Sequence, residues 1–217
     1  MKRDNLNLLV LLVLIFNFVI ISCSNTNNVK HVRDQFKEVI DDFDEQKQQV
    51  AEEFQEGKEV LLDFKEAIKK AKNKDAQFAK VHNKWEEIEK TVKELREKFI
   101  ELVKTADNFF AVLEEKANSI QDPDLREKTL NELNKSKQKY IERLRITKLK
   151  INELDRVNKR VEDIITALEI SYSLDILEEQ INKTFKEIDM MISSVMKELD
   201  ELSKESKALL NRRYGGY

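Results

Sequence analysis

Apolar residues recur with the period of an α-helix along most of the chain. The pattern is cleanest between residues 78 and 113, where apolar positions alternate three and four apart without a miss. These positions are Phe78, Val81, Trp85, Ile88, Val92, Leu95, Phe99, Leu102, Ala106, Phe109 and Leu113. A strand would need alternation at period two, so the segment is predicted to be a helix. Its mean spacing of about 3.5 predicts a seam that supercoils around its neighbours.

A second apolar row lies beside this seam. It consists of Ile100, Val103, Phe110 and Val112. The two rows together make a face that is too broad for one partner helix to cover. The segment is therefore predicted to sit in a bundle of at least three helices.

A first helical segment precedes this one. Its apolar positions are Val29, Val32, Phe36, Ile40, Phe43, Val50, Phe54, Leu61, Phe64, Ile68 and Ala71. Lys47 and Gly57 interrupt the stripe. Glycine costs about 1 kcal/mol relative to alanine inside a helix, so a loosened turn or a bend is expected at Gly57.

Two further helical segments follow. The third carries Leu130, Leu133, Tyr140, Leu144, Ile151, Leu154, Val161, Ile165 and Leu168, with Lys137, Thr147 and Asn158 at seam positions. The fourth carries Leu174, Leu177, Ile181, Phe185, Ile188, Ile192, Val195, Leu199, Leu202 and Leu209. Polar seam residues lower stability but help to select the register of a bundle.

Three breaks separate the segments. They are Lys72-Asn73-Lys74-Asp75, Asp122-Pro123 and Ser171-Tyr172-Ser173. Aspartate at the cap with proline at the first helical position is a strong start signal. Short connections favour antiparallel neighbours, so the fold is predicted as all-α: an elongated antiparallel bundle of about four long helices with coiled-coil-like seams. The alternative joins the last two helices through residues 171–173 into one longer coiled coil.

The amino terminus has the layout of a secretory signal. Lys2 and Arg3 precede an apolar run that begins near Leu6 and ends at Ile20-Ile21-Ser22-Cys23. The run is shorter than the roughly 20 residues of a spanning helix. An uncleaved anchor, or a plain signal that leaves Cys23 as a free thiol, are the alternatives. Residues 24–28 are predicted to be a polar tether that reaches at most about 17 Å when extended.

Composition supports this organisation. Charged residues make up 37% of the chain, with only 3 Gly and 1 Pro. Without residues 1–22 the 39 basic and 42 acidic side chains lose Lys2, Arg3 and Asp4, which leaves 37 and 41 and a net charge of −4. This balance argues against general affinity for nucleic acid. The predicted units are a signal (1–22), a tether (23–28), a bundle domain (29–211) and a frayed tail (212–217).

The cysteine that follows Ile20-Ile21-Ser22 resembles the lipobox of bacterial lipoproteins. With the short basic start, the Ser/Asn tether and the Lys/Glu/Asn-rich helical body, the chain looks like the surface lipoproteins of Borrelia-type spirochaetes. The resemblance implies a diacylglycerol on the sulfur of Cys23, cleavage before it and acylation of the new amino terminus. It also implies an outer-membrane location and binding of host matrix, glycosaminoglycans, complement regulators or vector tissue.

Residues for catalysis or metal binding are few. His31 and His82 are the only histidines, and neither completes the Glu-x-x-His pair of a di-iron bundle. His82 and Glu86 lie one turn apart, but two ligands do not make a site. Glycine-rich phosphate loops and the Gly-x-Ser-x-Gly motif are missing from the sequence. We therefore expect no enzyme, no cofactor and no metal.

One basic stripe stands out in the third segment. Between Lys135 and Lys150 there are seven cations and one acid, and Lys135, Lys139 and Arg143 share one side of a helix. The stripe is a candidate site for glycosaminoglycans, anionic headgroups or an acidic protein patch, and its four candidate binding residues are Lys135, Lys139, Arg143 and Lys150. The alternative is a solvated face paired with acids on neighbouring helices, such as the cluster Glu38, Asp41, Asp42, Asp44 and Glu45.

Three functions fit these features. The first is a lipid-anchored interaction protein at the cell surface that binds a host protein or a glycosaminoglycan. The second is a periplasmic spacer that holds envelope layers apart. The third is a homo-oligomer in which the apolar seams are completed between chains.

Overall fold

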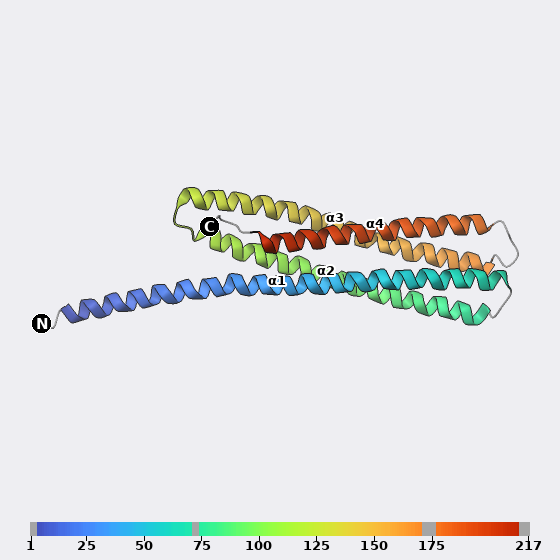
Figure 1. Ribbon diagram of the computed structural model, residues 1–217, viewed down its shortest axis with the longest axis horizontal. Helices are drawn as coiled ribbons and strands as arrows, with labels where there is room; N and C mark the ends of the chain where they lie inside the picture. The colour runs from blue at the N-terminus through green and yellow to red at the C-terminus, as the bar shows by residue number, and fades with distance from the viewer. Residues whose placement is uncertain (1–3, 71–73, 171–176, 213–217) are drawn as a thin grey trace.

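The computed structural model contains four long α-helices (Figure 1). They are α1 (Asp4–Lys69), α2 (Lys74–Asn118), α3 (Pro123–Ile170) and α4 (Leu177–Asn211). The structure describes residues 4–70, 74–170 and 177–212, and it describes side chains from Asn28 onward except beside the two internal gaps. Every regular element in these ranges is a helix, which confirms the all-α prediction.

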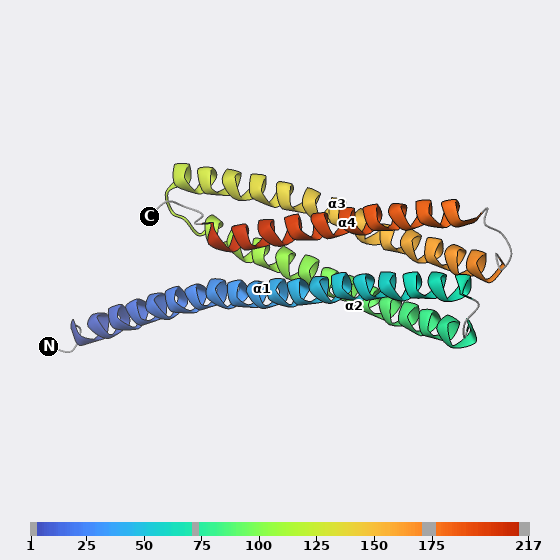
Figure 2. The ribbon, with the colours of Figure 1, turned by 45° about the vertical axis from the view of Figure 1, so that its right-hand side comes forward.

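The helices form an antiparallel bundle. α1 packs against α2 and α4, and α3 packs against the same two helices, as Figures 1 and 2 show. α3 and α4 therefore lie side by side, so the alternative in which they form one continuous helix is wrong. Residues 171–173, where the connection was predicted, lie outside the described residues.

The helix boundaries follow the predicted start and stop signals. α1 ends and α2 begins on either side of residues 70–73. α3 starts at Pro123, and the backbone N–H of Leu125 donates a hydrogen bond to Asp122 Oδ1 at 2.9 Å. The carboxylate of Asp122 thus satisfies one of the amide groups that the first turn of a helix leaves unpaired.

The predicted seams form the core. In α2, nine of the eleven seam residues are buried, and the outer two, Phe78 and Leu113, are half-buried. Aromatic rings meet across α1 and α2 in pairs: Phe36–Phe109, Phe43–Phe99, Phe54–Trp85 and Phe64–Phe78, with centroids 5.1 to 6.5 Å apart. In the second row Phe110 is buried, whereas Ile100 is 65% exposed. One helical step from buried Phe99 turns Ile100 out of the interface.

The expected loosened turn at Gly57 does not interrupt α1. The helix is continuous through this residue, which is buried against α2. A Cβ atom there would lie 2.5 Å from Ile88 Cδ1 and 2.9 Å from Trp85 Cζ3. The missing side chain leaves room for the indole ring, so the glycine serves close helix packing.

The predicted extended tether is also helical. Residues 24–28 belong to α1, because no glycine or proline lies between Asp4 and Gly57 to stop the helix. The predicted tail is partly ordered, since Arg212 donates a hydrogen bond to Ser136 Oγ at 2.6 Å. Residues 213–217 lie outside the described residues.

Candidate functional site

The basic stripe of α3 faces α4. The guanidinium of Arg143 donates to Glu198 Oε1 at 2.9 Å and to Glu205 Oε2 at 3.2 Å. Lys139 Nζ lies 3.2 Å from Glu205 Oε1. Both acids belong to α4, so two of the four candidate binding cations are already paired across the helix interface.

The other two candidate cations differ from each other. Lys150 Nζ lies 3.0 Å from Glu153 Oε1 on its own helix. Lys135 is exposed and makes no ion pair within the described ranges. Of the four candidate residues, a polyanion would therefore meet one ammonium without an ion pair among the described residues, that of Lys135, and three cations that already have carboxylate partners.

The carboxylate of Glu205 is adapted to this pairing. Partial burial raises its pKa, but hydrogen bonds from Arg143 and Lys139 outweigh burial and leave the pKa below the usual range. Glu205 therefore stays ionised, and an anionic ligand would have to displace it.

Hydroxyl groups complete the contact between α3 and α4. Tyr140 Oη and Ser206 Oγ are 2.6 Å apart, and Ser206 Oγ donates to the carbonyl of Leu202 at 2.8 Å. Thr147, which is fully buried, donates to Glu198 Oε1 at 3.2 Å. Burial raises the pKa of Tyr140, so its hydroxyl remains a neutral donor. The contacts of Tyr140 with Ser206 and of Thr147 with Glu198 bridge the two helices, so they depend on how α3 and α4 are aligned.

A second ionic cluster joins α1 to α4. Asp44 accepts hydrogen bonds from Lys47 at 3.0 Å, from Ser203 at 2.8 Å and from Lys207. Burial raises the pKa of Asp44, but these three donors outweigh it and lower the pKa below its ordinary value. Lys47 also lies 2.8 Å from Asp200, so the residue that interrupts the seam binds α4.

The source of the acids corrects the sequence interpretation. The alternative interpretation offered the cluster of Glu38 to Glu45 as one source of acids for the basic stripe, but Asp44 binds α4 and Asp42 lies 2.7 Å from Lys98 of α2. Glu198 and Glu205 neutralise Arg143 instead. Their separation of seven residues, which places both on one flank of α4, is the sequence signal that could have identified them.

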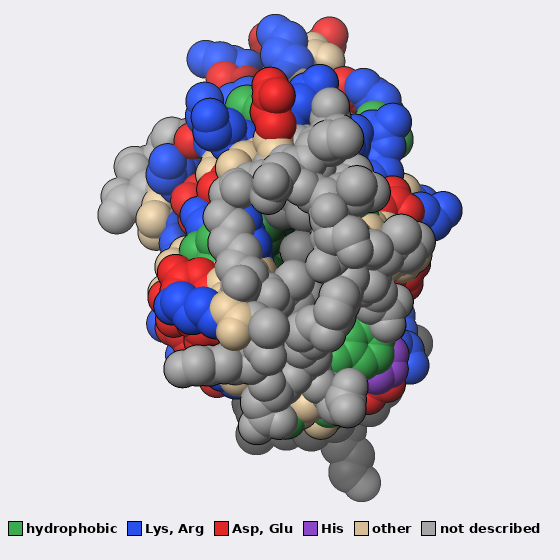
Figure 3. Space-filling model, turned by 90° about the vertical axis from the view of Figure 1, so that its right-hand side faces the viewer, with side chains coloured by type: hydrophobic (Ala, Val, Ile, Leu, Met, Phe, Trp, Pro, Cys, Tyr) green, Lys and Arg blue, Asp and Glu red, His purple; other side chains and the backbone are tan. Residues whose placement is uncertain are grey.

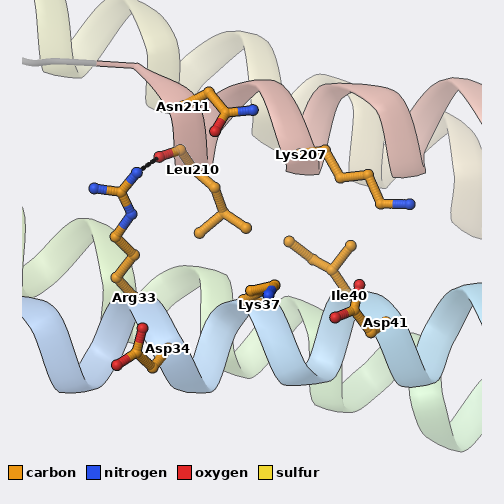
Figure 4. A pocket seen from close by; sticks show the side chains of 8 residues that line it. All are labelled: Arg33, Asp34, Lys37, Ile40, Asp41, Lys207, Leu210 and Asn211. Atoms are coloured by element: carbon orange, nitrogen blue, oxygen red, sulfur yellow. Dashed lines mark hydrogen bonds between the residues drawn. The ribbon is translucent and has the colours of Figure 1, made fainter.

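A cleft lies between α1 and the end of α4 (Figure 4). Its volume is about 290 Å³, and Ile40 and Leu210 contribute apolar surface to it. The guanidinium of Arg33 donates to the carbonyl of Leu210, a group that the last turn of a helix leaves unpaired. Four of the remaining lining residues are charged and carry both signs: Asp34, Lys37, Asp41 and Lys207. The last one, Asn211, is uncharged.

The end of the bundle opposite the start of α1 carries side chains of both charge signs. Figure 3, which looks onto the end opposite the start of α1, shows basic and acidic side chains interspersed around the described surface. A groove of about 480 Å³ between α1 and α2 is lined by Glu38, Asp42, Glu101 and Lys104 among others. This groove is lined mainly by charged and polar side chains and is open to solvent.

Metal ligands do not gather in the described part of the chain. His82 Nε2 lies 3.4 Å from Glu86 Oε1, and both side chains are about two-thirds exposed. Among residues with described side chains there is no group of three or more His, Cys, Asp or Glu that could hold an ion. In the same ranges no helix is long and apolar enough to cross a bilayer.

The predicted lipidation site lies within a helix. The backbone of Cys23 belongs to α1, in the part of that helix that comes before the first described side chain, Asn28. Neither a family model, nor a curated protein, nor a solved structure matches this chain.

Proposed function

We propose that this protein is a lipid-anchored, non-enzymatic interaction protein of a bacterial outer membrane. The observation that carries the proposal is the basic start and apolar run that end at Ile20-Ile21-Ser22-Cys23. Each buried methylene of an acyl chain contributes about 0.8 kcal/mol, so two or three chains at Cys23 give durable attachment. Residues 29–211 then form the part that meets a partner, a host protein or a glycosaminoglycan.

The charged exterior supports a role in recognition at a surface. A long bundle offers extended side faces, and its core is closed by apolar seams that need no cofactor. Because Lys139, Arg143 and Lys150 have carboxylate partners, Lys135 is the candidate residue that is most available to an anionic ligand.

Labelled palmitate tests the anchor. Cells that express the full chain are expected to incorporate label into the protein, and Cys23→Ser is expected to abolish incorporation. Ser24→Ala, which leaves the thiol in place, serves as the matched control. Equal labelling of the Cys23→Ser variant would contradict acylation at this residue.

Protease treatment of intact cells separates surface display from the periplasmic spacer. Digestion without permeabilisation supports the outward-facing protein. Survival until the outer membrane is opened supports the spacer, to which the elongated bundle is equally suited. Sedimentation of residues 24–217 tests the oligomer, and a monomer at micromolar concentration counts against it.

A further inference from the structure

The register of α1 against α2 fixes which parts of the bundle lie level with each other. Phe36 stacks on Phe109 at 5.1 Å, and Lys98 of α2 lies 2.7 Å from Asp42 of α1. Because the helices are antiparallel, a step toward the start of α1 corresponds to a step toward the end of α2. Levels along the rod therefore follow from residue counts at about 1.5 Å per residue.

Cys23 and the turn between α2 and α3 lie at about the same distance along the long axis of the bundle. Cys23 precedes Phe36 by 13 residues, which is about 20 Å of helix. Asn118, where α2 ends, follows Phe109 by nine residues, or about 14 Å, and the turn of residues 119–122 extends further. Figures 1 and 2 show the start of α1 projecting beyond this turn. Cleavage before Cys23 would remove the projecting part.

α4 does not reach this end of the bundle. From the contact of Tyr140 with Ser206, α3 extends 17 residues back to Pro123, whereas α4 extends five residues to Asn211. At 1.5 Å per residue, α4 stops about 18 Å short of the start of α3. The end that carries Cys23 is therefore built by α1, α2 and α3.

We infer that residues 119–125, which we call the foot, rest on the lipid headgroups when Cys23 is acylated, and that the bundle stands with its opposite end away from the bilayer. The inference rests on the proposed anchor. It does not depend on helix at residues 23–28, because an extended chain from Asn28 to Cys23 reaches only about 17 Å. The foot stays close to the headgroups in either case.

The side chains of the foot can lie against lipid headgroups once the acyl anchor holds the foot there. Gln121, Asp122 and Asp124 are exposed, and Leu125 is a large apolar side chain with 38% exposure. Polar side chains replace headgroup hydration, but one leucine beside two carboxylates supplies little affinity. The acyl chains therefore provide the binding energy, and the foot fixes orientation.

The described sides of the bundle offer little competing membrane surface. A helix that lies flat on a bilayer needs an apolar face flanked by cations. The exposed large apolar residues are few and lie on all four helices: Leu62 on α1, Ile100 on α2, Leu125, Ile141 and Leu149 on α3, and Met190 on α4. Lys139, Arg143 and Lys150 have carboxylate partners. A flat orientation would gain little from any described face.

Energy transfer from the single tryptophan tests the orientation. Trp85 packs at Gly57, which lies 34 residues beyond Cys23, so the indole stands about 51 Å above the anchored end. The chain from residue 23 keeps every described buried residue, the first of which is Val32. Its only cysteine, Cys23, is coupled to a maleimide phospholipid in phosphatidylcholine–phosphatidylglycerol vesicles that contain a dansyl headgroup acceptor.

We expect weak transfer from Trp85 and several-fold stronger transfer from Gln121→Trp in a Trp85→Phe background. Circular dichroism checks that both chains are folded. Transfer from Trp85 as strong as from the foot would overturn the upright orientation. Vesicle binding by the uncoupled chain would overturn the claim that the foot has little affinity of its own. Because coupling is chemical, a failure of palmitate labelling in cells refutes only the proposed natural anchor.

Discussion

The pair α1–α2 and the pair α3–α4 share one heptad pattern but are joined by different chemistry. Four aromatic pairs run along α1 and α2, from Phe36–Phe109 to Phe64–Phe78. Between α3 and α4 the apolar seam is accompanied by Arg143 with Glu198 and Glu205, and by Tyr140 with Ser206. Apolar burial is non-directional, whereas the bonds from Tyr140 and Arg143 to α4 depend on how the two helices are aligned. Ion pairs such as Lys98 with Asp42 also bridge α1 and α2, so the two interfaces differ in their aromatic content and not in whether they have polar contacts.

The proposed anchor lies on the pair that is joined by the aromatic contacts. Cys23 lies on α1, whose aromatic contacts with α2 do not depend on ionisation. α4 is held to α1 and α3 partly through Asp44 and Glu205, which do titrate. Acid is therefore expected to loosen α4 before it loosens the contact between α1 and α2.

The largest expected effect follows from an aromatic truncation between α1 and α2. Phe43 is fully buried, and its ring lies 6.5 Å from that of Phe99. Phe43→Ala is expected to lower the free energy of unfolding by about 3–5 kcal/mol, through lost burial and the cavity that remains. Urea denaturation measures the change. Leu149→Ala, at a side chain with 54% exposure, is the control and should change stability by less than about 0.5 kcal/mol.

A smaller decrease in the free energy of unfolding is expected from a substitution at the centre of the α3–α4 contact. Arg143→Met keeps the apolar stem but leaves Glu198 and Glu205 without their shared cation. Because these groups are partly exposed, the loss should be about 1–2 kcal/mol. In a double-mutant cycle with Glu205→Gln, additive effects would show that the pair contributes no coupling.

The dependence of stability on pH tests the role of Asp44. Its pKa is lowered in the folded state, so its contribution is complete above the unfolded value of about 3.9 and is lost as the pH falls through the folded pKa. Asp44→Asn should lower stability at pH 7 and flatten its decline between about pH 5 and pH 2. Asp34→Asn, at an exposed carboxylate without an ion pair in the described residues, should leave the decline unchanged.

The smallest effect is expected at the basic stripe. Lys135→Glu should weaken retention of the chain from residue 24 on heparin at low salt, because Lys135 is the candidate cation without a carboxylate partner. Reversal of Arg143 would also disturb α4, so Lys135 separates binding from folding more cleanly. Screening should abolish the weak retention at high salt. An unretained natural chain at low salt would remove the candidate site.

Much of the fold could be predicted from local pattern. The seam from Val81 to Phe109 depends on periodicity, and the start of α3 at Pro123 depends on capping. Both signals come from residues that are close together in the sequence. Gly57 could not be interpreted in this way, because its role depends on Trp85 of another helix. The burial of Phe110 and the exposure of Ile100 likewise depend on where α3 lies against α2.

The candidate site was less predictable for a related reason. The sequence identified the cations of α3, but it offered only the acid cluster of α1 as a source of their partners. The order of helices around the bundle decides which acids are near, and periodicity does not specify that order. The helical form of residues 24–28 was missed because Asn and Ser suggest loops, although nothing there stops a helix that has already started.

The intact mass of the protein purified from its cells tests the central claim most directly. We expect a chain that begins at Cys23 and carries one diacylglyceryl group on the sulfur and one acyl group on the amino terminus. A chain that retains residues 1–22, or one that begins elsewhere with an unmodified thiol at Cys23, would contradict the lipid anchor on which the proposed function depends.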